Sequence, residues 1–517
     1  MTERPDAIVI GAGHNGLVCA ASLARAGLGV TVLEARDVAG GMSSANGAHS
    51  EYRFPGLVHT SFPISGALRK HLQLDKHGYV PGDPVDTVSL QTDGRHLTLG
   101  RDGVSADGID ADQARVCESF LREFRSYADA LSPMMMNRPP RLKNMDFTDK
   151  STLAKLGWKI RLGLGKTSMY EFLRVAAINI HDVLEEALQD ERLKGLIAAD
   201  AVIGHHMGPR TPGTVLTWLL RLHSELNGPL SVESGDSSSL IQALLSSAQA
   251  SGVTIRLAEP VARILVDRGR ASGVELQNGE RLDADLVISS ADPRRTFLEQ
   301  VGAPNLDAMF AQRVTQIRGA GNVAKLQVAL SGQPEIEGLL AADLKNRFVI
   351  APSMNYLERA FNDSKYGDIS ADPLIELTFP SAHNPSLAPD GHHVMSVNIG
   401  YLPYKLNGGW EKERISLPQQ LIEKITGYVP NLSSLVVSHE LLTPPDIERD
   451  YHAVQGHWHH GEMTIHQSFM MRPLHGAAQY DTPVDGLFLC GAGCHPGGGL
   501  TGLPGYNAAR RVLELRA

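Results

Sequence analysis

The sequence has few cysteines, no long apolar run and no excess of basic residues. Four cysteines among 517 residues, Cys19, Cys117, Cys490 and Cys494, are too few for a disulfide scaffold. No apolar run is long enough to span a bilayer. A net charge of −9 argues against nucleic-acid partners. The first predicted strand begins by Ala7, which leaves no room for a leader peptide, so we expect a cytoplasmic globular protein.

The clearest motif stands at the start of the chain. A predicted strand at 7–10 runs directly into the glycine-rich turn GAGHNG at 11–16. Gly11 allows a tight turn, Gly13 lets the backbone approach a pyrophosphate, and Gly16 lets a helix pack close to the strand. A pyrophosphate is stabilised at such a helix N-terminus. The cofactor contacts expected here are Gly11, Gly13, Asn15 and Gly16, and the alternative is a glycine-rich turn that binds no ligand.

An acidic residue follows the next predicted strand. The strand at 30–33 ends at Glu34, which stands 18 residues after Gly16. At this position a carboxylate accepts hydrogen bonds from an adenosine ribose. Because it also repels a 2′-phosphate, NADP is not expected in this site.

A second glycine pair, Gly40-Gly41, comes soon after Glu34. The block from 34 to 41 resembles the ExxxxxGG segment of the FAD-binding family that includes amine oxidases, phytoene desaturases and carotenoid isomerases. The resemblance implies FAD as the cofactor, with Ala35, Gly40, Gly41 and Met42 beside it. Many members have arginine where this chain has Met42, so one polar contact near the flavin is missing.

The middle of the chain carries a second block of the same kind. Helical spacing over 240–250 precedes predicted strands at 253–257, 261–266, 271–276 and 285–289. This order resembles the three-stranded insertion of glutathione-reductase-like FAD domains, in which the backbone at the position of Val261 faces adenine. The Ala-Asp-Pro sequence that begins at Ala291 recurs in phytoene desaturase relatives, and the resemblance implies that Val261 and Ala291 contact the cofactor. These relatives usually have a glycine pair before the helix, where this chain has Ser-Gly-Asp at 234–236.

The C-terminal block is the most specific motif. After a predicted strand at 486–490 comes GAGCHPGGGLTGLPG at 491–505, followed by a predicted helix that extends to 515. Free N–H groups at the start of that helix favour negative charge on a reduced flavin. The run resembles a subgroup of the phytoene desaturase superfamily typified by pyridine nucleotide-disulphide oxidoreductase domain-containing protein 2. The cofactor contacts expected here are Gly491, Gly493, Gly502, Leu503 and Pro504.

These three blocks predict an α/β protein with a glutathione-reductase-like, Rossmann-type FAD-binding domain. The FAD-binding domain is expected to be discontinuous, comprising 1–70, 230–300 and 450–517. A discontinuous α+β substrate domain is expected to comprise 71–229 and 301–449.

Two side chains outside the glycine motifs are predicted to act in catalysis. Lys325 lies in a predicted strand at 322–330, on the face that also carries Gln327 and is suited to lining a cavity. In amine oxidases, a lysine on the matching strand reaches the flavin through water. The alternative is a lysine that extends from an edge strand into solvent. His59 falls where family members approach the flavin, and its alternative is a structural, hydrogen-bonded histidine.

The segment from His457 to Glu462 is rich in imidazole. A metal site is not expected, because histidines on a single strand rarely converge as ligands. His460 and Glu462 are predicted to line the flavin pocket as proton-transfer groups. Cys490 and Cys494 are interpreted as core residues rather than a redox pair.

A basic amphipathic stretch extends over about 138–174. It interleaves lysines and arginines with leucines and Trp158. Such a stretch is typical of a peripheral membrane contact, and the alternative is an ordinary solvated helix.

The sequence therefore predicts an FAD-dependent desaturase or dehydrogenase that moves a hydride from a C–H bond of a mostly apolar small molecule to flavin N5. Oxygen or a quinone is the expected electron acceptor, because only one complete dinucleotide fingerprint is present. The alternatives are an amine oxidase, a redox-neutral isomerase, a saturase, and a flavin-bound regulatory protein. The substrate and the oligomeric state stay open.

Overall fold

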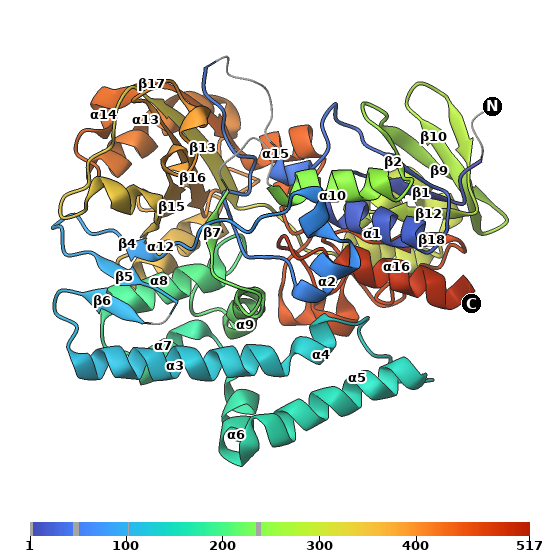
Figure 1. Ribbon diagram of the computed structural model, residues 1–517, viewed down its shortest axis with the longest axis horizontal. Coiled ribbons are helices and arrows are strands. Elements are labelled where there is room, and N and C mark those ends of the chain that lie inside the picture. The colour runs from blue at the N-terminus through green and yellow to red at the C-terminus, as the bar shows by residue number, and fades with distance from the viewer. Residues whose placement is uncertain (1–3, 45–50, 102, 234–238, 517) are drawn as a thin grey trace.

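The computed structural model describes residues 4–44, 51–101, 103–233 and 239–516. The departure from the family pattern at 234–236 lies outside these ranges. Figure 1 shows two halves side by side, with helices along the lower edge and both chain ends on the same side.

The first half, which we call the cofactor half, is built on a five-stranded parallel sheet. The strand order is β18 (Leu487–Leu489), β12 (Leu286–Ser289), β1 (Ala7–Ile10), β2 (Val30–Leu33) and β8 (Thr254–Arg256). Every residue of β1 is buried, as expected for a parallel strand covered on both faces. The helices α1 (His14–Arg25), α10 (Ser239–Ala250) and α16 (Leu503–Arg516) pack on this sheet (Figure 1). The predicted α/β class is confirmed.

A smaller antiparallel sheet extends from the cofactor half. It consists of β9 (Val261–Asp267), β10 (Arg270–Leu276) and β11 (Arg281–Asp283). The sequence predicted β9 and β10 but not the short β11. Its three residues are mostly exposed and carry no apolar alternation from which a strand would be predicted.

The second half, which we call the substrate half, is built on an eight-stranded sheet. The order is β17 (Val436–Leu442), β13 (Val323–Leu330), β16 (His393–Gly400), β15 (Leu374–Thr378), β14 (Arg347–Ile350), β4 (Thr87–Ser89), β5 (Leu97–Leu99) and β6 (Val104–Ala106). All eight residues of β13 are buried, and β13 lies between β16 and β17. The alternative that Lys325 extends from an edge strand is therefore wrong. One face of the sheet packs on α13 (Trp410–Thr426).

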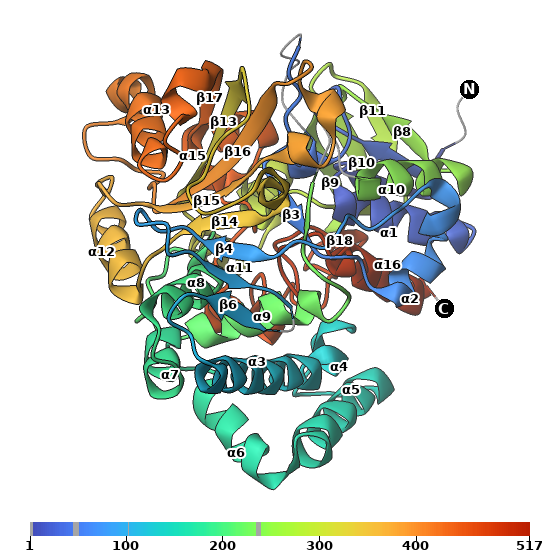
Figure 2. The same ribbon diagram turned by 60° about the vertical axis from the view of Figure 1, so that its left-hand side comes forward.

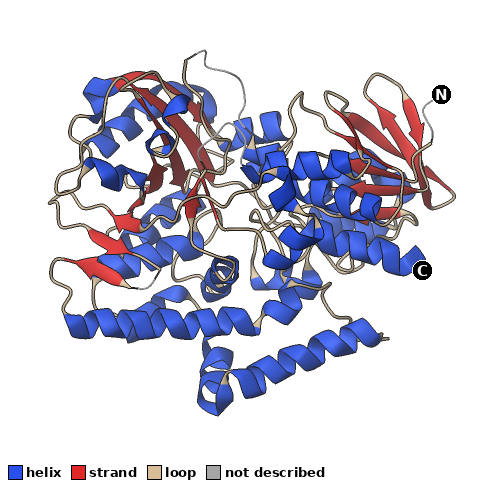
Figure 3. Cartoon of the chain, viewed as in Figure 1, coloured by secondary structure: helices blue, strands red, loops and turns tan. Residues whose placement is uncertain are grey.

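Helices form the lower edge of the substrate half, whereas strands lie above them (Figure 3). The helices that share one apolar core are α3 (Ala111–Ala130), α8 (Glu191–Val202), α9 (Thr214–Glu225) and α12 (Met354–Lys365). Beyond α3, a hairpin projects from the body in both views (Figures 1 and 2). It comprises α5 (Phe147–Trp158), a π-helical turn (Lys159–Gly163) and α6 (Gly165–Val175). Within the described ranges, no helix is both long and apolar enough to cross a bilayer.

A two-stranded ribbon lies at the junction of the halves. Its strands are β3 (Thr60–Ser61) and β7 (Ser231–Val232), which pair antiparallel. The side chains around β3 therefore lie where the two halves meet. The domain limits given above stay a prediction.

Candidate functional site

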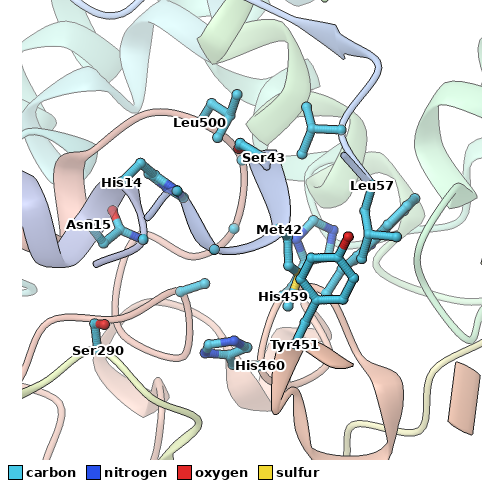
Figure 4. Close-up of a pocket in the computed structure, with 18 of the residues that line it drawn as sticks. His14, Asn15, Met42, Ser43, Leu57, Ser290, Tyr451, His459, His460 and Leu500 are labelled. Atoms are coloured by element: carbon cyan, nitrogen blue, oxygen red, sulfur yellow. The ribbon is translucent and has the colours of Figure 1, made fainter. Parts of the chain in front are cut away.

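A large cavity lies between the two halves. Its volume is about 2330 Å³, counting the space open to solvent. Its lining includes the glycine turn, the segment around Glu34, residues 57–63 around β3 and the histidine-rich loop. Figure 4 shows His14, Tyr451, His460 and Leu500, from separate segments, around the same space.

The glycine turn fits a bound pyrophosphate. Gly11 has φ +95°, and a Cβ there would lie 2.4 Å from Ser290 Oγ. A Cβ on Gly16 would lie 2.0 Å from the Gly11 carbonyl oxygen, so only glycine allows α1 to start this close to β1. In contrast, the space beside Gly13 is open, with Gly41 Cα as the nearest atom at 4.0 Å. The N-terminus of α1 has no side-chain cap and no acidic residue in its first turn, which leaves its N–H groups for an anion.

The predicted ribose carboxylate is fixed by backbone donors. Glu34 is buried, and its Oε2 accepts a hydrogen bond from the Ala12 N–H at 2.7 Å. Its Oε1 accepts from the Arg36 N–H at 3.0 Å. Glu34 and its neighbour Ala35 both line the cavity. The carboxylate therefore has a defined orientation beside the glycine turn.

The second glycine pair lies against the first glycine motif. Gly40 has φ +120°, and its N–H donates to the Ala12 carbonyl oxygen at 2.9 Å. Arg36 Nη1 donates to the Gly41 carbonyl oxygen at 2.9 Å, and its guanidinium lies 4.6 Å from the ring centre of Tyr451. Gly40, Gly41 and Met42 line the cavity. Arg36 thus supplies a cation here, although Met42 replaces the arginine of many family members.

Of the cofactor contacts predicted in the middle and at the C-terminus of the chain, the structure places only those in the middle at the cavity. Val261 and Ala291 line the cavity. The C-terminal residues predicted as contacts do not lie among the described lining residues; they are Gly491, Gly493, Gly502, Leu503 and Pro504. Their neighbours in the lining are instead Ala492, Gly498, Gly499, Leu500 and Thr501. Gly491 and Gly493 serve close packing, because a Cβ would lie 2.3 Å from Ser290 O and 2.5 Å from Pro293 Cδ, respectively. The predicted contacts of these five residues with FAD stay a prediction.

Several polar ring atoms around the cavity are buried without a hydrogen-bond partner in the described part of the chain. They are His14 Nε2, His205 Nδ1, Trp458 Nε1 and His460 Nδ1. A buried polar atom without a partner costs about 1–3 kcal/mol. A flat heteroaromatic ring with polar edges supplies partners for such atoms. Together with the glycine turn and Glu34, this donor set fits FAD.

The imidazoles around the cavity are held neutral. Burial lowers the pKa of His14, His205 and His460 to about 4 in each case. Burial also lowers the pKa of His459 well below its ordinary value, and its ring stacks on His205 at 5.1 Å. At neutral pH each ring therefore has one nitrogen that donates and one that accepts a hydrogen bond.

The sequence interpretation placed the histidine-rich segment on a strand, and this is wrong. It forms an irregular loop in which His460 has φ +53°. Such a turn was not visible from composition, because the bend depends on contacts with distant residues. His460 lines the cavity, whereas Glu462 lies behind it, with Oε1 3.1 Å from His457 Nε2. The charge and hydrogen bond of His457 outweigh burial, so the pKa of Glu462 is lowered.

A set of buried or half-buried ionisable side chains, together with the amide of Asn398, forms the opposite wall, and we call it the ion cluster. Its members are His59, Asp200, Lys325, Arg347, Glu376 and Asn398. Arg347 is completely buried and pairs with Glu376 and, at 2.7 Å, with Asp200. Burial opposes ionisation of Glu376, but the charge of Arg347 and the hydrogen bond from Asn398 prevail and hold its pKa well below the usual range.

His59 and Lys325 are joined through one amide in this cluster. Asn398 Nδ2 donates to His59 Nε2 at 2.9 Å and to Glu376 Oε2 at 2.8 Å, while Asn398 Oδ1 accepts from Lys325 Nζ at 3.1 Å. Burial lowers the pKa of His59 to about 4 and that of Lys325 to about 7. His59, Glu376 and Asn398 line the cavity, and Lys325 lies one contact behind them.

Sequence reasoning missed most of this wall. The missed lining residues include Asp200, Arg221, Glu376, Asn398, Tyr451 and Trp458. One signal was available: Glu376 is a carboxylate in the middle of an apolar strand, Leu-Ile-Glu-Leu-Thr. A charge in such a strand requires a buried partner. The partner itself was not predictable, because Arg347 reaches it from another strand.

The four cysteines are all buried and free, and Cys490 and Cys494 belong to the core of the cofactor half. Burial raises the pKa of Cys494 to about 12, which opposes thiolate chemistry. Among the described residues, no three side chains of metal-binding type come together as a metal site.

Comparison with known proteins gives a consistent assignment. The family "Flavin containing amine oxidoreductase" matches residues 16–513. The mouse (Mus musculus) protein "Pyridine nucleotide-disulfide oxidoreductase domain-containing protein 2" is 33% identical over 541 residues, covering 98% of this chain and 93% of the relative. A lycopene-forming phytoene desaturase of Paracoccus sp. is 24% identical, covering 98% of this chain and 97% of the relative.

The fold has solved counterparts as well. The crystal structure of an oxidoreductase from Methanosarcina mazei matches with a TM-score of 0.59 at 18% identity, covering 98% of this chain and 99% of that one. The predicted resemblance to the phytoene desaturase superfamily and its subgroup is confirmed. The chain belongs to the flavin-containing amine oxidoreductase family and is an FAD-dependent oxidoreductase.

Proposed function

We propose that this protein is a desaturase or dehydrogenase that oxidises a C–H bond of a mostly apolar small molecule. The observation that carries the proposal is that the glycine turn and the ion cluster share one cavity. Apolar side chains from the substrate half, such as Ile203, Leu220 and Leu230, line it as well. When bound, FAD supplies the hydride acceptor, its N5 atom.

Removal of a hydride from a substrate leaves a proton to be accepted. We assign this role to His59. Its Nε2 accepts a hydrogen bond from Asn398 Nδ2 at 2.9 Å and so carries no proton, whereas its Nδ1 carries the proton and lies 3.1 Å from the Ser396 carbonyl oxygen and 3.2 Å from Ser396 Oγ. On protonation, Nε2 faces Glu376 Oε2 at 3.1 Å, so the carboxylate stabilises the imidazolium. Lys325, with a pKa of about 7, is held beside this pair by its hydrogen bond to Asn398 Oδ1.

His460 and the glycine-rich segments are proposed to hold the cofactor, with Glu34 at the ribose. Glu462 is proposed to orient the histidine loop through His457. Oxygen or a quinone is proposed as the electron acceptor.

Anaerobic bleaching of the flavin tests this function. The purified holoprotein is mixed without oxygen with polyenes, terpenes, lipids and amines, and the loss of visible absorbance is followed. We expect bleaching by apolar compounds with an oxidisable C–H bond, and slower bleaching in His59→Leu at unchanged FAD content. Bleaching by amines alone, with a hydrogen peroxide burst in air, contradicts the proposal and supports an amine oxidase. A requirement for pre-reduced flavin supports an isomerase or a saturase instead.

We also propose that the projecting hairpin contacts an anionic membrane surface. Phe147 and Trp158 on α5 are 86% and 61% exposed, and Leu162 in the π-helical turn is 62% exposed. The exposed cations beside them are Lys143, Lys150, Lys155, Arg161 and Lys166. Apolar residues flanked by cations are typical of segments that lie on anionic lipid.

Vesicle flotation tests the membrane contact. We expect the protein to float with phosphatidylcholine vesicles that contain phosphatidylglycerol, and less so at high salt. Phe147→Ser combined with Trp158→Ser is expected to reduce flotation several-fold. The matched control is Ile415→Ser, which replaces an apolar residue that is 83% exposed on α13. Equal flotation of the double variant and the control contradicts the proposal.

A further inference from the structure

One helix of the substrate half presents a polar stripe to the cavity. Thr217, Arg221 and Ser224 lie on one face of α9, four and three residues apart, and all three line the cavity. Asn227, just beyond the helix, is exposed and lines the cavity too, so the stripe leads inward from the surface.

Arg221 is held in place through its Nε atom, and its two terminal nitrogens have no partner among the described residues. Its Nε lies 3.0 Å from Asp200 Oδ2, and its guanidinium lies 5.2 Å from the ring centre of Phe62. Throughout the described part of the chain, neither terminal nitrogen of Arg221 donates a hydrogen bond, and Ser224 Oγ makes none either. The terminal nitrogens of a guanidinium are the pair that binds a carboxylate in a bidentate manner.

The carboxylates on this wall are already neutralised. Asp200 lies between two cations, with Oδ1 2.7 Å from Arg347 and Oδ2 3.0 Å from Arg221. Glu376 pairs with Arg347 and His59 and accepts a hydrogen bond from Asn398. What remains unused on this wall is the hydrogen-bond donor capacity of the Arg221 terminal nitrogens, and donors favour a carboxylate over an amine.

We propose that Arg221, assisted by Ser224, binds the carboxylate of an otherwise apolar substrate. The substrate class of this oxidoreductase is then an apolar carboxylic acid, rather than a neutral hydrocarbon or an amine. The inference rests on the proposed function, since it places the substrate in the same cavity. A phosphate dianion is a poorer match, because Asp200 lies directly behind the guanidinium. Ile203, Leu220 and Leu230 offer the apolar surface for the remainder of the molecule.

Three probes that share one alkyl chain and differ in the head group test this inference on the holoprotein. They are dodecanoate, dodecanol and dodecylamine, each used below its critical micelle concentration. Binding is measured by calorimetry and by the change in the flavin spectrum. We expect dodecanoate to bind at least tenfold more tightly than dodecanol. Arg221→Gln is expected to weaken dodecanoate binding roughly 10- to 100-fold and to leave dodecanol within about twofold.

Two further variants separate recognition from structure. Arg221→Lys keeps the positive charge but loses the two terminal nitrogens that bind a carboxylate together. Its affinity for dodecanoate is therefore expected to lie between those of the wild type and Arg221→Gln. Arg263→Gln removes an exposed arginine of β9, which is 62% exposed, and is expected to bind all probes as the wild type does.

The inference is overturned if dodecanoate and dodecanol bind wild type equally, if dodecylamine binds most tightly, or if Arg221→Gln weakens all three probes alike. A protein that binds dodecanol at the flavin but does not prefer dodecanoate contradicts only this inference. A protein that retains FAD but shows no spectral response to any apolar probe contradicts the proposed function itself.

Discussion

The two halves of the molecule prepare the cavity in different ways. The cofactor half does so mainly with backbone: Gly11 and Gly16 bring α1 against β1, and Glu34 is held by two backbone N–H groups. The substrate half does so with side chains, because His59, Asn398 and Glu376 converge from separate strands and loops. Backbone recognition suits a cofactor of fixed shape, whereas side-chain recognition lets the substrate vary while the fold stays the same.

The largest expected effect is the loss of FAD from a variant changed only in the cofactor half. Gly16→Val places a side chain where a Cβ already lies 2.0 Å from Gly11 O, so the turn cannot form and the protein is expected to purify without FAD. FAD released on denaturation measures this. Gly66→Ala is the control, because a Cβ there meets nothing within 4 Å. Retention of one FAD per chain by Gly16→Val contradicts the role of the turn.

The next effect is a loss of stability from a substitution in the substrate half. Glu376→Gln leaves Arg347 with a reduced countercharge in a fully buried position, and we expect a loss of about 3–5 kcal/mol in the free energy of unfolding. Urea denaturation of the holoprotein measures it. Asp285→Asn removes an ion pair to Arg4 that is more than half exposed, and should change stability by about 0–1 kcal/mol. If both variants lose the same amount, the ion cluster is not the buried network described.

A smaller effect sharpens the comparison within the cofactor half. Glu34→Gln removes the charge that two backbone donors and the ribose share, so the dissociation constant for FAD is expected to rise roughly 10- to 100-fold. Fluorescence titration of the apoprotein with FAD gives the constant. Asp37→Asn, an exposed carboxylate nearby, is the control. A Glu34→Gln constant within twofold of the control shows that the carboxylate does not serve the cofactor.

The smallest effect is a pH dependence. Burial lowers the pKa of Lys325 from 10.5 to about 7, so between these values the unfolded state binds more protons and wild-type stability rises with pH. The slope is roughly 1.4 kcal/mol per pH unit, or about 2 kcal/mol between pH 7 and 8.5. Lys325→Met lacks this slope, so its stability relative to wild type is greatest below pH 7 and falls as the pH rises.

Denaturation of wild type and Lys325→Met at several pH values measures the difference. Lys405→Met, at an exposed position, serves as the control and should run parallel to wild type. A Lys325→Met curve that is also parallel to wild type means that Lys325 stays charged when folded.

The sequence predicted the cofactor half well for a physical reason. A tight turn, a helix start and a carboxylate after a strand all depend on residues that are close in sequence, so Gly11, Gly16 and Glu34 could be assigned from their spacing alone. The C-terminal block was located, but the residues of this block that line the cavity are neighbours of the predicted ones. The reason is that glycines that serve packing, such as Gly491, look the same in sequence as those that face a ligand.

The substrate half was only partly predictable. The alternation of apolar and polar residues located Lys325 on a cavity-side face, but not the amide of Asn398 that separates it from the cavity. Arg221 gave no sequence signal, because its role depends on a partner from α8 and a ring from the segment around β3. Contacts between remote segments follow from the fold and not from local pattern.

A crystal structure of the holoprotein tests the central claim most directly. The account predicts FAD in the shared cavity, in contact with the glycine turn, Glu34 and the loop around His460, with its flavin ring also reached by residues 57–63. FAD bound elsewhere, or a flavin ring without any contact to the substrate half, contradicts the account.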